Sequence, residues 1–222
     1  RFFFGFDFLG QLLGLNEQAV LFRARLPIDR LGQSSFSLDA GEYFRLWEAI
    51  HELLDTDRPA PLILAEAIRF DMFSPALMAA ACSPDFQTCV RRLQEFKPLI
   101  GPLVFDVSST DREMSIGIRS VVPGSDHHTF VVASEFVFLT GLVRHSTDNP
   151  HIRPLRVESR EPLIQGEYAE YFGVRPRRGD ADRISFATSD AQLHFSTENE
   201  SLWSFFAPEL RRRLDELDVD AT

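Results

Sequence analysis

The sequence predicts an α+β fold, in which helices pack on a small antiparallel sheet built from hairpins within a single domain. Three observations carry this prediction. Residues 84–97 form an amphipathic pattern with helical spacing, and residues 103–107 and 113–122 alternate in polarity as strands do. A third, apolar helix follows over about residues 130–145. The order of helix, hairpin and helix indicates one mixed unit.

The first 38 residues form an irregular N-terminal segment in this prediction. Leucines at positions 9, 12, 13 and 15 favour a short helix, which Gly14 can end. Pro27 and residues 32–35 are typical of a loop. Five phenylalanines crowd the first eight residues without the basic region of a signal peptide, and the chain begins at Arg1, so we expect a trimmed boundary.

Three helices are expected between residues 39 and 82. Asp39 and Glu42 have the spacing of a reciprocal capping box, which predicts a helix over residues 39–55. A stiff segment at residues 58–61 leads into a shorter helix over residues 62–70. Ser74 and Pro75 then cap and open a helix over residues 75–82.

For the next helix, the sequence predicts the start, the buried face and the end. Ser83 is the predicted cap, Pro84 suits the first helical position, and Pro98 is expected to end the helix. The apolar side chains recur every three or four residues. They are Phe86, Cys89, Val90, Leu93 and Phe96.

Beyond the first hairpin, the pattern predicts further strands and helices. Pro123 and Gly124 break the sheet, and Ser125 or Asp126 can cap the apolar helix. A strand is expected at residues 155–159 and a helix at 163–172, with Gly173 as its left-handed end. Residues 183–187 and 192–195 predict a second hairpin, and residues 202–217 an amphipathic helix.

Composition excludes several classes of function. The net charge of −10 and pI near 5.1 argue against nucleic-acid binding by this chain, since phosphate contacts need clustered Lys and Arg. Cys82 and Cys89 are too few for a disulfide framework, so a reduced cytoplasmic setting is expected. The longest apolar stretch has fourteen residues and contains Glu135, so we expect no membrane span.

No catalytic motif is present, and we expect no enzyme activity, no cofactor and no metal. Neighbouring His127 and His128 diverge on a helix, which disfavours a shared ion. Glu135 lies in an apolar helix, where its carboxylate needs a partner: either an internal ion pair, for example with an arginine, or a cationic ligand.

Two cationic side chains suggest instead a negatively charged ligand. Lys97, the single lysine, and Arg119 lie beside apolar elements and could hold a ligand carboxylate, although both residue types more often reach solvent. Phe105 and Phe138 are candidate apolar lining. The predicted ligand-binding residues are therefore Lys97, Phe105, Arg119, Glu135 and Phe138.

Two segments resemble the N-terminal effector-sensing, arabinose-binding-type domain of AraC-family transcription regulators. Residues 73–86, continued by residues 93–99, are similar to the middle of that domain. Residues 168–174 resemble its Tyr-x-x-x-Phe-Gly run, followed by the Phe-containing segments 184–186 and 193–195. The resemblance extends from about residue 39 to residue 217.

The resemblance implies an effector-binding and dimerisation domain over residues 39–217, with residues 218–222 beginning a linker. It implies a small-molecule effector, a homodimer as one form, and DNA contact only through a C-terminal helix-turn-helix domain absent from this chain. A rival hypothesis is a protein-interaction module without a small-molecule site, which an exposed apolar stripe on the 202–217 helix would favour. An enzyme site pairing Glu135 with a histidine ranks last.

Overall fold

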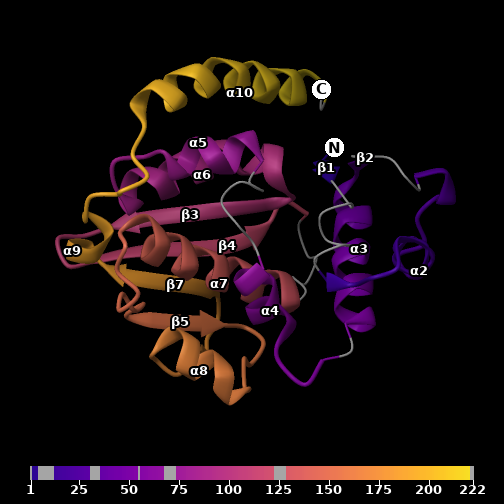
Figure 1. Cartoon of the computed structure of the whole chain (residues 1–222), viewed down its shortest axis with the longest axis horizontal. Coiled ribbons are helices and arrows are strands. Elements are labelled where there is room, and N and C mark those ends of the chain that lie inside the picture. The colour runs from indigo at the N-terminus through magenta and orange to yellow at the C-terminus, as the bar shows by residue number, and fades with distance from the viewer. Residues whose placement is uncertain are drawn as a thin grey trace.

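The protein is built around a five-stranded sheet, which confirms the predicted α+β class (Figure 1). The computed structural model describes residues 2–4, 13–30, 36–54, 56–67, 74–122 and 129–220. The strands lie in the order β3 (Leu103–Ser109), β4 (Glu113–Ser120), β7 (Asp182–Ala187), β5 (Arg156–Ser159) and β6 (Arg177–Arg178). Neighbours are antiparallel, except that β5 and β6 run parallel.

Helices cover one side of this sheet. The predicted apolar helix is α7 (Thr129–Ser146), which packs against α4 (Ala60–Ala67), while α6 (Phe86–Ile100) packs against α5 (Pro75–Ala81) and β3 (Figure 1). The core lies between the helices and the apolar sheet face. Its strand residues include Phe105, Met114, Ile116, Ile184 and Phe186.

Helix α6 forms as predicted but begins and ends differently. Asp85, rather than Ser83, caps it by accepting a hydrogen bond from the Thr88 amide, because the Ser83 hydroxyl instead donates to the Ala80 carbonyl. Pro98 lies inside the last turn and does not end the helix. Proline removes a single amide donor there, and the helix continues to Ile100 before Gly101.

Other helix ends match the local signals. Asp39 and Glu42 form both bonds of the capping box at the start of α3 (Ala40–Leu53). Ser74 caps α5. Gly173, with φ of 71°, ends α8 (Gly166–Phe172), and Gly14 also has a positive φ of 64°. These signals act over three or four residues, so the sequence alone displays them.

The predicted second hairpin is wrong. Residues 188–191 form the short helix α9 (Thr188–Ala191), where the Thr188 hydroxyl donates to the Thr110 carbonyl. The chain then leaves the sheet, and the Phe195 amide donates to the Pro84 carbonyl beside α6. Strand β7 pairs instead with β4 and β5, because both offer apolar faces continuous with its own.

The segment predicted as irregular contains regular structure. Strand β1 (Phe2–Phe4) pairs antiparallel with β2 (Phe36–Leu38), and Asn16 caps α2 (Glu17–Arg23), which precedes the short 3₁₀ helix η1 (Ile28–Arg30). Val20 and Leu21 of α2 are buried in the main core. Tertiary burial thus stabilises a helix too short to be evident from periodicity.

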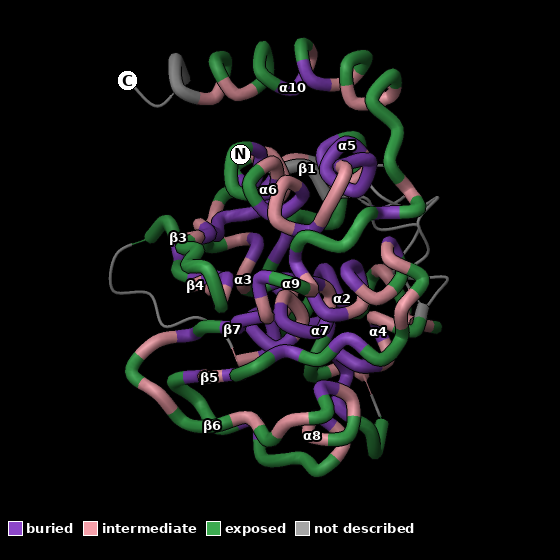
Figure 2. The backbone as a smooth tube through the Cα atoms, turned by 90° about the vertical axis from the view of Figure 1, so that its left-hand side faces the viewer, coloured by how far each residue is buried: buried purple, intermediate pink, exposed green. Residues whose placement is uncertain are grey.

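The last helix, α10 (Glu200–Asp220), lies across α5 and α6 (Figure 1). Figure 2 shows α10 as mostly exposed, in contrast to α5 below it. Its apolar side chains meet Phe96 of α6 in a second, smaller core. These side chains are Trp203, Phe206, Leu210 and Leu214. The predicted amphipathic stripe therefore faces the protein.

Some expectations cannot be placed. His127, His128 and the predicted caps Ser125 and Asp126 lie outside the described residues. Across the ranges that the structure describes, no helix is both long enough and apolar enough to cross a membrane. Cys82 and Cys89 are buried and unpaired, and burial raises the pKa of the Cys89 thiol, which fits a packing role.

The capping box can be tested by Asp39→Ala. Loss of the cap is expected to lower the free energy of unfolding by about 1 kcal/mol, because the amides at the start of α3 lose their partner. Urea denaturation measures the change. Asp57→Ala, at an exposed position before α4, serves as the control and should leave stability nearly unchanged. Equal effects of the two substitutions would contradict the capping role.

Candidate functional site

A buried ion pair joins α6 and α7, two long helices of the main core. Lys97 lies in the last turn of α6, and Glu135 lies in the second turn of α7. Lys97 Nζ is 2.6 Å from Glu135 Oε1, and the two side chains are only 4% and 14% exposed. The structure therefore pairs two residues that sequence reasoning treated as separate anchors of opposite charge.

Aromatic side chains surround this pair. Lys97 Nζ lies 4.5 Å from the centroid of the Phe105 ring, a cation–π contact with the buried face of β3. Tyr43 of α3 is buried as well, and the pKa of its hydroxyl is raised, first by burial and then by the negative charge of Glu135. Both charges are thus held in surroundings of low polarity, where their attraction is strong.

The pair retains unused hydrogen-bonding capacity. Glu135 Oε2 is buried and, within the described part of the chain, accepts no hydrogen bond. An ammonium group has three donors, and among the described residues the one hydrogen bond of Lys97 goes to Glu135 Oε1. A buried acceptor without a partner is costly, so this oxygen is suited to receive a hydroxyl or amine of a bound molecule.

Close packing holds Tyr43 against the end of α6. A Cβ atom at Gly101, the residue after α6, would lie 2.9 Å from the Tyr43 oxygen, closer than two such atoms can approach. Glycine at this position therefore allows the contact. The approach of Tyr43 to Glu135 depends on how α3 and α7 pack, which no local pattern in the sequence reveals.

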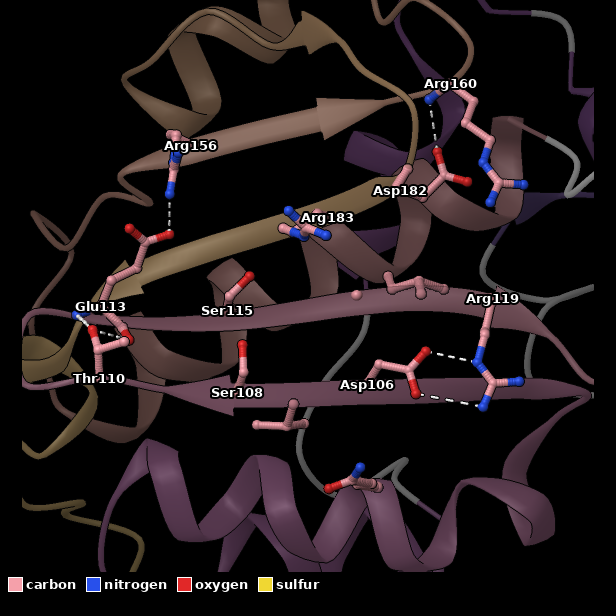
Figure 3. A pocket seen from close by; sticks show the side chains of 15 residues that line it. Asp106, Ser108, Thr110, Glu113, Ser115, Arg119, Arg156, Arg160, Asp182 and Arg183 are labelled. Carbon is pink, nitrogen blue, oxygen red and sulfur yellow. Dashed lines mark hydrogen bonds and ion pairs between the residues drawn. The ribbon is translucent and has the colours of Figure 1, made fainter.

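The other predicted residues divide between two places. Phe138 lies one turn beyond Glu135 on α7, is partly buried and packs against the main core. Arg119 does not join the pair. It lies on the opposite, polar face of the sheet, where its Nε donates to Asp106 Oδ2 at 2.6 Å (Figure 3). The structure thus brings together Lys97, Phe105 and Glu135 and separates Arg119 from them.

The alternation along β4 explains that separation. Ile116 and Ile118 are buried in the core, so Arg119, one position further, points to the other face. Its side chain is 55% exposed, as is that of Asp106. Ligand binding by any of the five residues stays a prediction. Of the two cations, Lys97 is shielded from water, whereas Arg119 is exposed.

Comparisons with known proteins agree with this architecture. A crystal structure of the transcriptional regulator CdpR from Pseudomonas aeruginosa superposes with a TM-score of 0.55 at 18% identity, covering 90% of this chain. The chain spans 61% of the length of that structure, and the likeness concerns the fold. A search among curated proteins finds no match.

A protein-family model matches residues 14–195, which is most of the chain. It describes the arabinose-binding domain of AraC transcription regulators, at their N-terminus. The matched region contains α6, α7 and the whole five-stranded sheet, and so includes the Lys97–Glu135 pair. The chain therefore belongs to the family of N-terminal arabinose-binding domains of AraC transcription regulators.

Proposed function

We propose that this domain binds a small cytosolic effector beside the Lys97–Glu135 pair and thereby controls a C-terminal helix-turn-helix domain. The observation that carries the proposal is the buried ion pair with an unsatisfied acceptor, Glu135 Oε2. Family membership and the likeness to a transcriptional regulator support a role in transcription. The role is one of binding, with no catalytic step.

The ion pair provides selectivity for a polar group on an otherwise apolar effector. A donor on the effector can satisfy Glu135 Oε2, and an acceptor can take a remaining Lys97 N–H. Phe105 contributes apolar contact at the same place. An effector that makes these bonds in one arrangement of α6 and α7 shifts the domain toward it, to the extent that it binds that arrangement better.

Helix α6 connects this site to the C-terminal helix. Phe96, the neighbour of Lys97, lies with its ring centroid 6.0 Å from that of Trp203 in α10. One turn before Phe96, Arg92 stacks over the Trp203 ring at 3.6 Å. Glu95, next to Phe96 in the sequence, accepts a hydrogen bond from Arg211 of α10. Displacement of the last turns of α6 would therefore change how α10 packs against α6.

The position of α10 makes this coupling relevant to regulation. It is the last described element, and in AraC regulators of this kind the sensing domain lies at the N-terminus. A change in α10 would alter the orientation or dimerisation of whatever follows it. Effector binding and the state of the distal domain would then be coupled reciprocally.

One observation favours the rival role of a protein-interaction module. Phe205 on α10 is 75% exposed, and a groove of about 490 Å³ lies beside it. The apolar residues at this groove are Pro75, Phe205, Phe206, Pro208 and Leu210. Because most of the α10 stripe is already covered by α5 and α6, this surface is small.

The ion pair can be tested by Lys97→Met. This substitution leaves Glu135 buried without its counter-charge and is expected to cost about 3–5 kcal/mol of unfolding free energy, measured by urea denaturation. The double variant Lys97→Met with Glu135→Leu should regain much of that loss. Arg119→Met, which breaks an exposed pair, should cost less than about 1 kcal/mol. A Lys97→Met variant as stable as Arg119→Met would refute the buried-pair interpretation.

Effector binding can be tested by a thermal-shift screen with small metabolites and fatty acids. A true effector is expected to raise the melting temperature, because it binds the folded state. The shift should fall strongly in Glu135→Gln, which keeps the size of the side chain nearly unchanged, and in Phe105→Leu, which removes the aromatic ring. It should persist in Arg119→Gln. Hits whose shift survives both core substitutions would place the effector elsewhere.

The coupling to α10 can be followed by fluorescence. The chain has two tryptophans, so Trp47→Phe leaves Trp203 as the single emitter. A validated effector is expected to change the emission of Trp203, because Phe96 and Arg92 contact its ring. The same titration of Glu135→Gln in this background should show no change. Unaltered Trp203 emission at saturating effector would contradict transmission through α6.

A further inference from the structure

The polar face of the sheet contains a groove that the proposed function does not use (Figure 3). We call it the sheet groove. Its volume is about 640 Å³, within the usual range for small-molecule sites. Side chains of β3, β4 and β7, together with Arg156 of β5, form most of its surface. The residues that matter below are Asp106, Ser108, Glu113, Ser115, Gly117, Arg119, Arg156 and Arg183.

Small residues make the sheet groove hollow. Ser108 of β3 lies directly opposite Ser115 of β4, and in the next row Gly117 lies between Asp106 and Arg183. Figure 3 shows the two serines projecting side by side from the sheet. Within the described residues, neither serine hydroxyl makes a hydrogen bond, so both are available to a bound molecule.

Arginines dominate the charge of the sheet groove. Four line it, namely Arg119, Arg156, Arg160 and Arg183, against the three carboxylates of Asp106, Glu113 and Asp182. The chain as a whole carries a net charge of −10, whereas the lining of this groove holds one more arginine than carboxylates, and the carboxylate of Glu158 in β5, opposite Arg183, borders it. Such a site attracts anions against the background of the rest of the surface.

Most of these charges are already fixed in place. Arg119 pairs with Asp106 toward one end of the groove, and Arg156 pairs with Glu113 at the other, where the guanidinium lowers the pKa of the Glu113 carboxyl (Figure 3). The Asp182 carboxylate accepts bonds from the Ser159 hydroxyl and the Arg160 amide. These contacts hold the groove in shape without a ligand.

Arg183 is the exception. It lies in β7 at the centre of the groove, and among the described residues its guanidinium has no hydrogen bond or ion pair. Guanidinium presents a planar set of donors that matches carboxylate and phosphate oxygens. An oxyanion at Arg183 would also be near the Ser115 hydroxyl, in the adjacent strand and row.

We propose that the sheet groove is a second small-molecule site, which binds a hydroxylated molecule bearing a carboxylate or phosphate group. Arg183 binds the oxyanion, and Ser108 and Ser115 bind hydroxyl groups. The site is separate from the Lys97–Glu135 pair, because strand alternation places the two on opposite faces of the sheet. Its occupancy therefore does not depend on the proposed effector site.

The test is isothermal titration of the 222-residue chain with citrate, inorganic phosphate and a sugar phosphate, at low ionic strength. At least one probe is expected to bind saturably, and added salt should weaken it. Arg183→Gln should reduce the affinity about tenfold or more, because a charge-assisted contact is lost. The matched control is Arg178→Gln in β6, an exposed arginine outside the groove, which should leave the affinity unchanged.

A second variant fills the groove without removing charge. A Cβ atom at Gly117 would make only ordinary contacts of 3.6 Å, so Gly117→Gln should fold and block the centre. Citrate distinguishes the carboxylate source from the two phosphate probes. The proposal is overturned if no probe binds saturably, or if binding survives Arg183→Gln and Gly117→Gln. It is also overturned if these variants leave the affinity for the probes unchanged but alter the sedimentation coefficient. That outcome would mean that the groove is a contact surface between protein molecules.

Discussion

The ion pair between Lys97 and Glu135 constrains how the two central helices meet. Both charges are removed from water, so each is tolerable only while the other stays within hydrogen-bonding distance. The last turn of α6 must then keep Lys97 in contact with the Phe105 ring, and α7 must keep Glu135 within reach of Lys97. Gly101 completes the arrangement by leaving room for Tyr43 beside the end of α6. The environment proposed for the effector is a consequence of this one contact.

The same helix has a different role on its other side. Phe96, Arg92 and Glu95 contact α10, so α6 lies between a charged, shielded site and the C-terminal helix. Buried, closely packed contacts transmit displacement because they have little room to absorb it. This placement suggests how a sensing domain of this family could work: a molecule that displaces α6 would also displace α10, the C-terminal helix.

The sheet offers two chemically distinct surfaces because strand residues alternate between its faces. In β4, Ile116 and Ile118 complete the core, whereas Gly117 and Arg119 face the sheet groove. The apolar face was readily predicted from this alternation. The arginine groove was not, because its members come from strands far apart in sequence: Arg183 lies opposite Gly117 only through the β4–β7 pairing.

Local signals in the sequence determined the α+β class, the capping box of Asp39 and Glu42, the Gly173 helix end and the hairpin of β3 and β4. Each depends on residues a few positions apart. Tertiary structure decided that α6 passes through Pro98, that β7 joins β4 and β5, and that Glu135 pairs with Lys97 rather than with an arginine. Lys97 and Glu135 are 38 residues apart, and a contact across that distance arises from the packing of whole helices, which no short pattern encodes.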